Sequence, residues 1–171
     1  MSLSMYQVSI PVLTRGLEVL ADLLAKGAVH VQENGLDPGS VLATRLAPDM
    51  MPLSAQVQRA SDTAKFAAAR LAGGAGPSFD DDEASFEELR QRCAKTVSYL
   101  ETVRPEALEG SETRQVAFGG GVLKATLPGD DYLLRFALPN FFFHVTTAYD
   151  ILRHVGVPLG KLDYLGMHER K

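Results

Sequence analysis

Two polar side chains, Asn140 and His144, lie within the most apolar stretch of the chain, residues 136–145. They are four residues apart, so on a helix both occupy the same face, one turn from each other. Thr147 continues that stripe by a further turn. An imidazole can bind a metal or move a proton near neutral pH, and an amide can orient a ligand through hydrogen bonds. We therefore expect the chemistry of this protein to begin at this pair.

Three interpretations of the pair remain open. Burying Asn140 and His144 costs roughly a few kcal/mol unless each side chain finds hydrogen-bond partners. In the first interpretation they bond to each other, to water, or to Gln56 or Asp62 on an earlier helix. The pair can instead line a small-molecule pocket, with Gln56, Asp62 and Thr147 as further candidates. The third interpretation is a metal centre with His144 as its main ligand. Asn140 and Gln56 would then be weak ligands, because an amide oxygen is a neutral, poor ligand for zinc or nickel.

Four long helices must position these side chains. Apolar residues recur at the helical period over residues 5–34, from Pro52 to the Gly73-Gly74 pair, over 82–103 and over 130–156. In the last helix, Pro139 predicts a kink just before Asn140, and Asp130 or Asp131 is the expected cap. The acidic run at residues 80–83 predicts the start of the third helix, where carboxylates complement the helix dipole.

The segments between the helices carry weaker signals. Residues 36–51 read as a connection with a short helical turn at 41–46. Two β-prone runs, 113–118 and 122–127, flank three consecutive glycines and predict a hairpin. The tail after residue 156 is expected to wrap over the bundle. The sequence thus predicts a single all-α domain over residues 1–171, a four-helix bundle with a small β-hairpin inserted between helices three and four.

Composition excludes several classes of protein. The 171 residues carry a net charge of −4 and no basic cluster, so we expect no nucleic-acid partner. No apolar segment is long enough to span a bilayer, and no leader pattern opens the chain, so a soluble, cytoplasmic protein without a membrane partner is expected. Cys93 is the only cysteine and falls on an apolar helical stripe, which favours a buried core thiol over a nucleophile.

Three stretches carry a resemblance to a known family: SMYQVSIPVLTRGL, LAPDMMPLSAQVQRASDTAK and PNFFFHVTTAYDILRHVGVPLGKLDYLG. The chain resembles the DinB-like superfamily of damage-inducible and YfiT-like metalloenzymes, specifically an uncharacterised domain-of-unknown-function branch. In that superfamily the last helix bears a His-x-x-x-His pair ahead of the glycine that closes the helix. Counting twelve residues back from Gly156 reaches His144, and four more reach Asn140. The second histidine is therefore present and the first is an asparagine.

The resemblance implies an up-down bundle that is commonly dimeric. Members with a complete triad bind nickel or zinc through one histidine of the second helix and two of the fourth, and some act as thiol-dependent transferases or isomerases. This chain has Asn140 at one ligand position and no histidine in its second helix, where Gln56 and Asp62 are the nearest polar candidates. We expect a homodimer with a degenerate metal site and no cofactor, non-catalytic or binding a small ligand. The alternative is a nickel- or zinc-dependent enzyme of thiol-transferase type with a pocket around His144.

Overall fold

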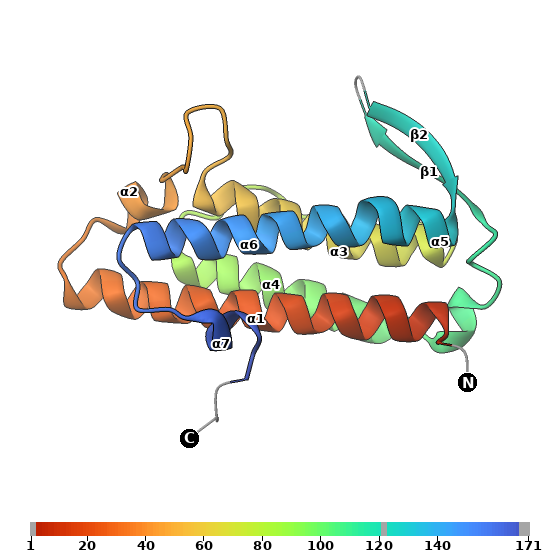
Figure 1. The fold of residues 1–171 in the computed structure, drawn as a ribbon, viewed down its shortest axis with the longest axis horizontal. Helices are drawn as coiled ribbons and strands as arrows, with labels where there is room; N and C mark the ends of the chain where they lie inside the picture. Colours follow the sequence, from red (N-terminus) through yellow and green to blue (C-terminus); the bar gives the residue numbers. More distant parts are fainter. Residues whose placement is uncertain (1–2, 121–122, 168–171) are drawn as a thin grey trace.

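The computed structural model describes residues 3–120 and 123–167. Within these residues four long helices lie side by side in an elongated bundle (Figure 1). Helices α1 and α3 each pack against both α4 and α6. The predicted four-helix bundle with a hairpin before its last long helix is confirmed. The long helices are α1 (Met5–Glu33), α3 (Leu53–Leu71), α4 (Phe86–Thr102) and α6 (Leu138–His154).

The first two long helices begin and end close to the residues that the sequence predicts. Ser4 caps α1 in a capping box with Gln7, and Pro11 lies inside this helix. On α3 the apolar residues at helical spacing form a fully buried stripe, in which alanines let neighbouring helices approach closely: Leu53, Val57, Ala60, Ala64, Ala67 and Leu71. Between the two helices, the short α2 (Pro38–Leu42) begins earlier than the predicted turn at 41–46, because Asp37 caps it and Pro38 occupies its first turn.

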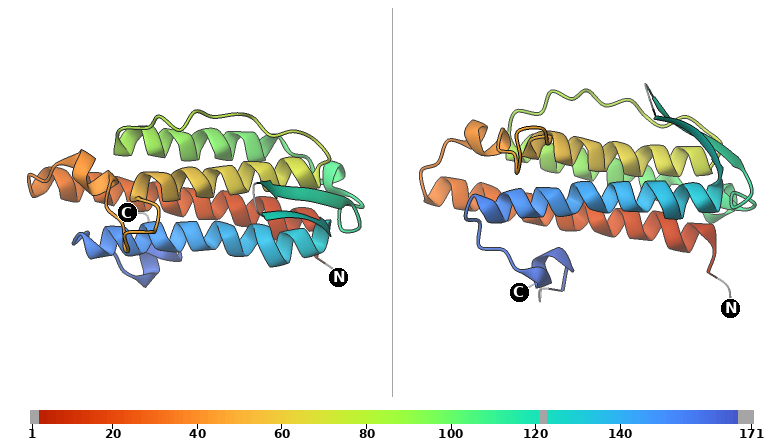
Figure 2. Two further views of the ribbon diagram at one scale, coloured as in Figure 1. Left: turned by 90° about the horizontal axis from the view of Figure 1, so that it is seen from above. Right: turned by 45° about the horizontal axis from the view of Figure 1, so that its top comes forward.

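Helices α3 and α4 run in the same direction. The connection over residues 72–85 travels back along the length of the bundle before α4 begins (Figure 2). The expected start of this helix at residue 82 is wrong, because the cap is Ser85, whose side chain accepts from the backbone N–H of Glu88. The acidic run at 80–83 therefore precedes the helix. Its Asp81 and Glu83 form ion pairs with arginines instead of complementing the helix dipole.

A short helical turn, Pro105–Leu108, precedes the hairpin. The hairpin consists of β1 (Gln115–Gly120) and β2 (Leu123–Pro128), which pair antiparallel. Residues 121 and 122 of the predicted tip lie outside the described residues. The hairpin lies at the end of the bundle where α3 ends (Figure 1). Its Phe118 is buried against Tyr132 and Phe136, with ring centroids 5.0 and 4.4 Å away. This aromatic contact supplies the packing that a lone hairpin needs.

The last long helix is assembled from three segments. The short α5 (Gly129–Tyr132) leads through a π-helical turn (Leu133–Ala137) into α6. The predicted cap at Asp130 or Asp131 is wrong, since Pro128 holds that position and both aspartates lie in the first turn. Where the sequence predicts a kink beside Pro139, the structure has this π turn just before the proline. In it the backbone N–H of Leu138 donates to the backbone oxygen of Leu133. Such turns often occur at functional sites.

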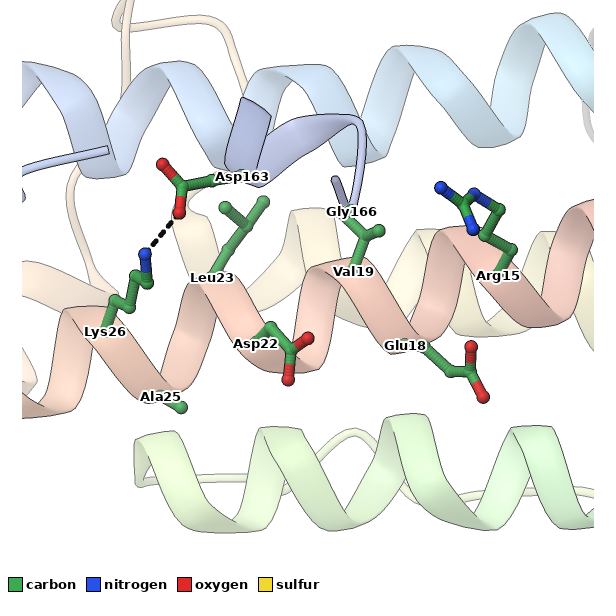
Figure 3. Close-up of a pocket in the computed structure, with 9 residues that line it drawn as sticks. All are labelled: Arg15, Glu18, Val19, Asp22, Leu23, Ala25, Lys26, Asp163 and Gly166. Carbon is green, nitrogen blue, oxygen red and sulfur yellow. Dashed lines mark hydrogen bonds and ion pairs between the residues drawn. The ribbon is translucent and has the colours of Figure 1, made fainter. Parts of the chain in front are cut away.

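The described part of the tail lies on α1, as predicted. Helix α7 (Lys161–Tyr164) places the Asp163 carboxylate against the Lys26 ammonium of α1 (Figure 3). Arg15, also on α1, donates a hydrogen bond of 2.5 Å to the backbone oxygen of Leu165. A cavity of about 270 Å³ lies between these two segments. None of the predicted site residues lines it.

Candidate functional site

The structure brings His144 and Gln56 together from helices α6 and α3. Nδ1 of His144 lies 2.8 Å from Oε1 of Gln56, and both side chains are buried. Nε2 of Gln56 donates to the backbone oxygen of Met51 at 3.0 Å, which identifies Oε1 as the acceptor in the pair. Nδ1 of His144 therefore carries the proton. Nε2 of the neutral ring keeps its lone pair and makes no hydrogen bond to any described residue.

Asn140 forms a second interhelical contact one turn away. Its Nδ2 donates to Oγ1 of Thr63 on α3 at 2.8 Å. The Thr63 hydroxyl proton is itself donated to the backbone oxygen of Arg59 at 2.7 Å, so the hydroxyl can only accept from the amide. The amide oxygen of Asn140 makes no hydrogen bond within residues 3–120 and 123–167. Asn140 and His144 thus each reach α3, and each keeps one acceptor without a donor among the described residues.

A cavity of about 210 Å³ opens beside these two side chains, and we call it the His144 groove. One wall comes from α3 and the other from α5, the π turn and α6, with Gly119 of β1 at the rim. The volume lies below the range of drug-sized pockets, which restricts a ligand to a small molecule. The side walls are formed by Arg59, Asp62, Thr63, Phe66, Arg70, Tyr132, Phe136, Asn140 and His144.

Two predicted site residues serve other contacts. Asp62 borders the groove, but its carboxylate is surrounded by three cations: Arg59 at 3.1 Å, Lys65 at 2.8 Å and Arg92 at 2.9 Å. Thr147 is buried one turn beyond His144 and donates to a backbone oxygen of its own helix, so it does not line the groove. Gln56 lies behind the imidazole rather than in the cavity wall.

Burial and the nearby Arg59 guanidinium lower the pKa of His144 to about 4. The imidazole is consequently neutral at physiological pH and presents a hydrogen-bond acceptor to the groove. Its low pKa also makes it a weak proton acceptor. Cys93, the other nucleophile candidate, does not line the groove, because it is buried on α4. Burial raises the pKa of its thiol to about 12. This confirms the predicted core thiol.

The low pKa of His144 predicts an acid-dependent loss of stability. The unfolded chain binds this proton near pH 6.5 and the native chain only near pH 4, so the unfolded state binds more protons between these values. Acidification from about pH 7 to about pH 5 should lower the free energy of unfolding by ~2 kcal/mol through this group. Urea unfolding at both values measures it. The H144Q variant should lose this part of the slope, whereas H154Q, at an exposed position, should keep it; equal slopes in both would contradict the prediction.

The residues of the groove do not fit a nickel or zinc ion. Among residues 3–120 and 123–167, no three histidine, cysteine, aspartate or glutamate side chains are grouped so that they could hold a metal. Nδ1 of His144 is protonated toward Gln56, Asn140 offers a neutral amide oxygen, and Asp62 is already matched by cations. Arg59 adds positive charge where a divalent cation would sit.

Several groove residues were not predicted from the sequence. On the α6 side, Tyr132 and Phe136 continue the spacing of Asn140 and His144, so a row at every fourth residue could have been found. Arg70 carries no comparable signal, because a basic residue in the last turn of a helix is ordinarily explained by the helix dipole.

The fold and the groove between the second and fourth long helices define the class of a DinB-like helical-bundle protein. A crystal structure of a DinB family member protein from Shewanella denitrificans superposes with a TM-score of 0.89 and is 37% identical, covering 98% of this chain and 94% of that one. Residues 5–165 match a family model described as a domain of unknown function, DUF1993. The chain belongs to this DUF1993 family. A comparison with curated proteins finds no match.

The described residues contain no helix with the length and apolar character required to cross a membrane.

Proposed function

We propose that the protein binds a small organic molecule in the His144 groove without a metal ion, and that it is not a catalyst of metal-dependent thiol transfer. The observation that carries this proposal is the paired hydrogen bonding of His144 to Gln56 and of Asn140 to Thr63. Both contacts fix the side chains and leave their second polar atoms beside the cavity, with no hydrogen bond to the part of the chain that the structure describes. Positioned polar groups beside aromatic side chains, here Phe66, Tyr132 and Phe136, are typical of small-molecule sites.

The absence of a strong base or nucleophile among the described groove residues supports binding rather than catalysis. Phe66 and Phe136 line the groove, and their aromatic side chains suit an aromatic or aliphatic body. The acceptors on Asn140 and His144 suit a ligand that donates hydrogen bonds. The pKa of His144 is too low for efficient proton abstraction at neutral pH.

Benzamide is a suitable probe, because it combines an aromatic ring with an N–H donor. We expect titration with benzamide to shift the imidazole ¹⁵N resonances of His144 and to give weak, saturable binding. The H144F variant keeps a ring but removes the acceptor, and should weaken binding about fivefold to tenfold, the value of one hydrogen bond. The matched control, H30F, changes a histidine outside the groove and should bind benzamide like the parent protein. Equal binding by H144F, or no binding by the parent protein, would overturn the proposal.

The metal-dependent alternative is tested in the same samples. Tag-free protein is incubated with nickel or zinc, desalted and analysed for metal, in parallel with H144F. Near-stoichiometric metal that disappears in the variant would contradict a metal-free groove and favour the thiol-transferase alternative around His144. Homodimer formation and a cytoplasmic location stay predictions from the sequence, and sedimentation equilibrium would test the first.

A further inference from the structure

Arg70 is a cation of the groove that forms no ion pair within the described part of the chain. The other groove arginine, Arg59, pairs with Asp62 and Asp81, and the buried Arg92 pairs with acidic residues as well. Arg70 is half-buried on the last turn of α3 and lines the groove. A partly desolvated guanidinium beside a cavity, without a carboxylate of its own, is suited to bind an anion from outside.

Aromatic side chains hold this guanidinium in place. Nη1 of Arg70 donates to the hydroxyl of Tyr132 at 3.1 Å, and Cζ lies 5.3 Å from the ring centroid of Phe66 and 6.0 Å from that of Tyr132. This contact uses one of the five N–H donors of the guanidinium. The Tyr132 hydroxyl accepts that bond and makes no donor contact to any described residue. Burial raises the pKa of Tyr132, so the hydroxyl keeps its proton and can donate it to a ligand.

Three hydrogen bonds join α3 to the last long helix and the short α5 before it, along the length of the groove. Tyr132 meets Arg70 at one end, Asn140 meets Thr63 further along, and His144 meets Gln56 at the other end. Arg59 and Arg70 lie about 16 Å apart along the axis of α3, at 1.5 Å per residue. Along its length the groove has a cationic end at Arg70, an aromatic middle at Phe66 and Phe136, and a polar end at His144.

A second cavity continues from the cationic end. It measures about 470 Å³ and shares Arg70 and Gly119 with the His144 groove. Its remaining lining comes from the hairpin and includes the exposed Lys124. The positive φ of Gly119, 87°, is a backbone conformation that L side chains rarely adopt. The cavity provides an open approach to the guanidinium, with a second cation along it.

We propose that the small molecule bound in the groove is an organic carboxylate, held by the Arg70 guanidinium and the Tyr132 hydroxyl, with its apolar body between Phe66 and Phe136. This inference rests on the proposed function, because it names the ligand class of the same groove. A planar carboxylate matches the guanidinium fork. A phosphate dianion fits less well, since Arg70 is the only groove arginine without an acidic partner among the described residues and offers a single positive charge.

Benzoate and benzamide form the test pair, because they have the same shape and differ in charge. In the parent protein we expect benzoate to bind about tenfold tighter than benzamide, which is the contribution of a charge-assisted hydrogen bond. In R70Q the preference of the groove for benzoate over benzamide should be lost, because the cation that distinguishes the two probes is gone. The matched control R135Q, which replaces an exposed arginine on the π turn, should keep the tenfold difference. Inorganic phosphate at equal ionic strength should not displace benzoate.

The outcomes separate this inference from the proposed function. If benzamide binds and benzoate binds no better, or if R70Q keeps the preference for benzoate, the carboxylate assignment is overturned and the groove proposal stands. Displacement of benzoate by phosphate at the same concentration would also overturn it, by making Arg70 a general anion site. If neither aromatic probe binds, both proposals are overturned.

Discussion

Replacing Arg92 by methionine should lower the free energy of unfolding by about 3–5 kcal/mol, the largest electrostatic effect we expect in this protein. The Arg92 side chain is 1% exposed and donates to Glu83 at 2.8 Å and to Asp62 at 2.9 Å. Nε also donates to Ser61 at 3.1 Å. One guanidinium thereby joins α4, α3 and the connection over residues 72–85. Removing it leaves the largely buried Glu83 carboxylate without an ion-pair partner among the described residues and takes one of three cations from Asp62, which costs more than the pairs contribute.

The electrostatics of Glu83 support this expectation. Burial alone would raise its pKa, but hydrogen bonds from Arg92 and Gln58 hold the pKa below the ordinary value. In R92M only the Gln58 contact at 2.9 Å remains from the described side chains. We therefore expect the segment before α4 to exchange its amide protons faster in R92M than in the parent protein, in addition to the overall loss of stability.

Arg90 supplies the matched control for this experiment. It lies on the same helix, and its side chain is 42% exposed in a pair with Glu87. Exposed ion pairs contribute little, so R90M should change the free energy of unfolding by less than ~1 kcal/mol. Both variants are compared with the parent protein by urea unfolding at neutral pH. Similar losses in R90M and R92M would contradict the role assigned to the buried guanidinium.

The F141A substitution should also cost about 3–5 kcal/mol, for an apolar reason. The ring of Phe141 is fully buried between α6 and α1. It occupies the space beside Gly16, where a side-chain carbon would lie only 2.4 Å from the ring. Truncation removes buried apolar area and leaves a cavity between two helices that can relax only partly.

Another phenylalanine on the same helix provides the control for this prediction. Phe143 is 55% exposed, so F143A should lower the free energy of unfolding by less than ~1 kcal/mol. A second variant, G16A, tests the contact from the other side and should be destabilising by about 1–3 kcal/mol through overpacking against Phe141. Chemical unfolding of the three variants under identical conditions measures these differences. A loss in F143A as large as that in F141A would contradict the observed orientation of α6.

Local pattern was sufficient to predict much of the fold. The period of the apolar residues identified the long helices and their buried stripes, including the position of Cys93 in the core. The glycine run between two β-prone segments indicated the hairpin. The four-residue spacing of Asn140 and His144 placed both on one face of the last helix. These features depend on residues close together in the chain, where backbone geometry fixes which side chains share a face.

The tertiary structure decided which partners these side chains meet. His144 contacts Gln56, which is 88 residues away in the chain. Arg92 meets Glu83 because the connection over residues 72–85 runs back along the bundle before α4 begins. No local pattern in the acidic run distinguishes a helix start from a set of partners for a distant arginine. The pairing of Arg70 with Tyr132 likewise depends on the direction and register of α3 against the last helix. Periodicity determines which face of a helix is buried, but the packing of helices determines what that face contacts.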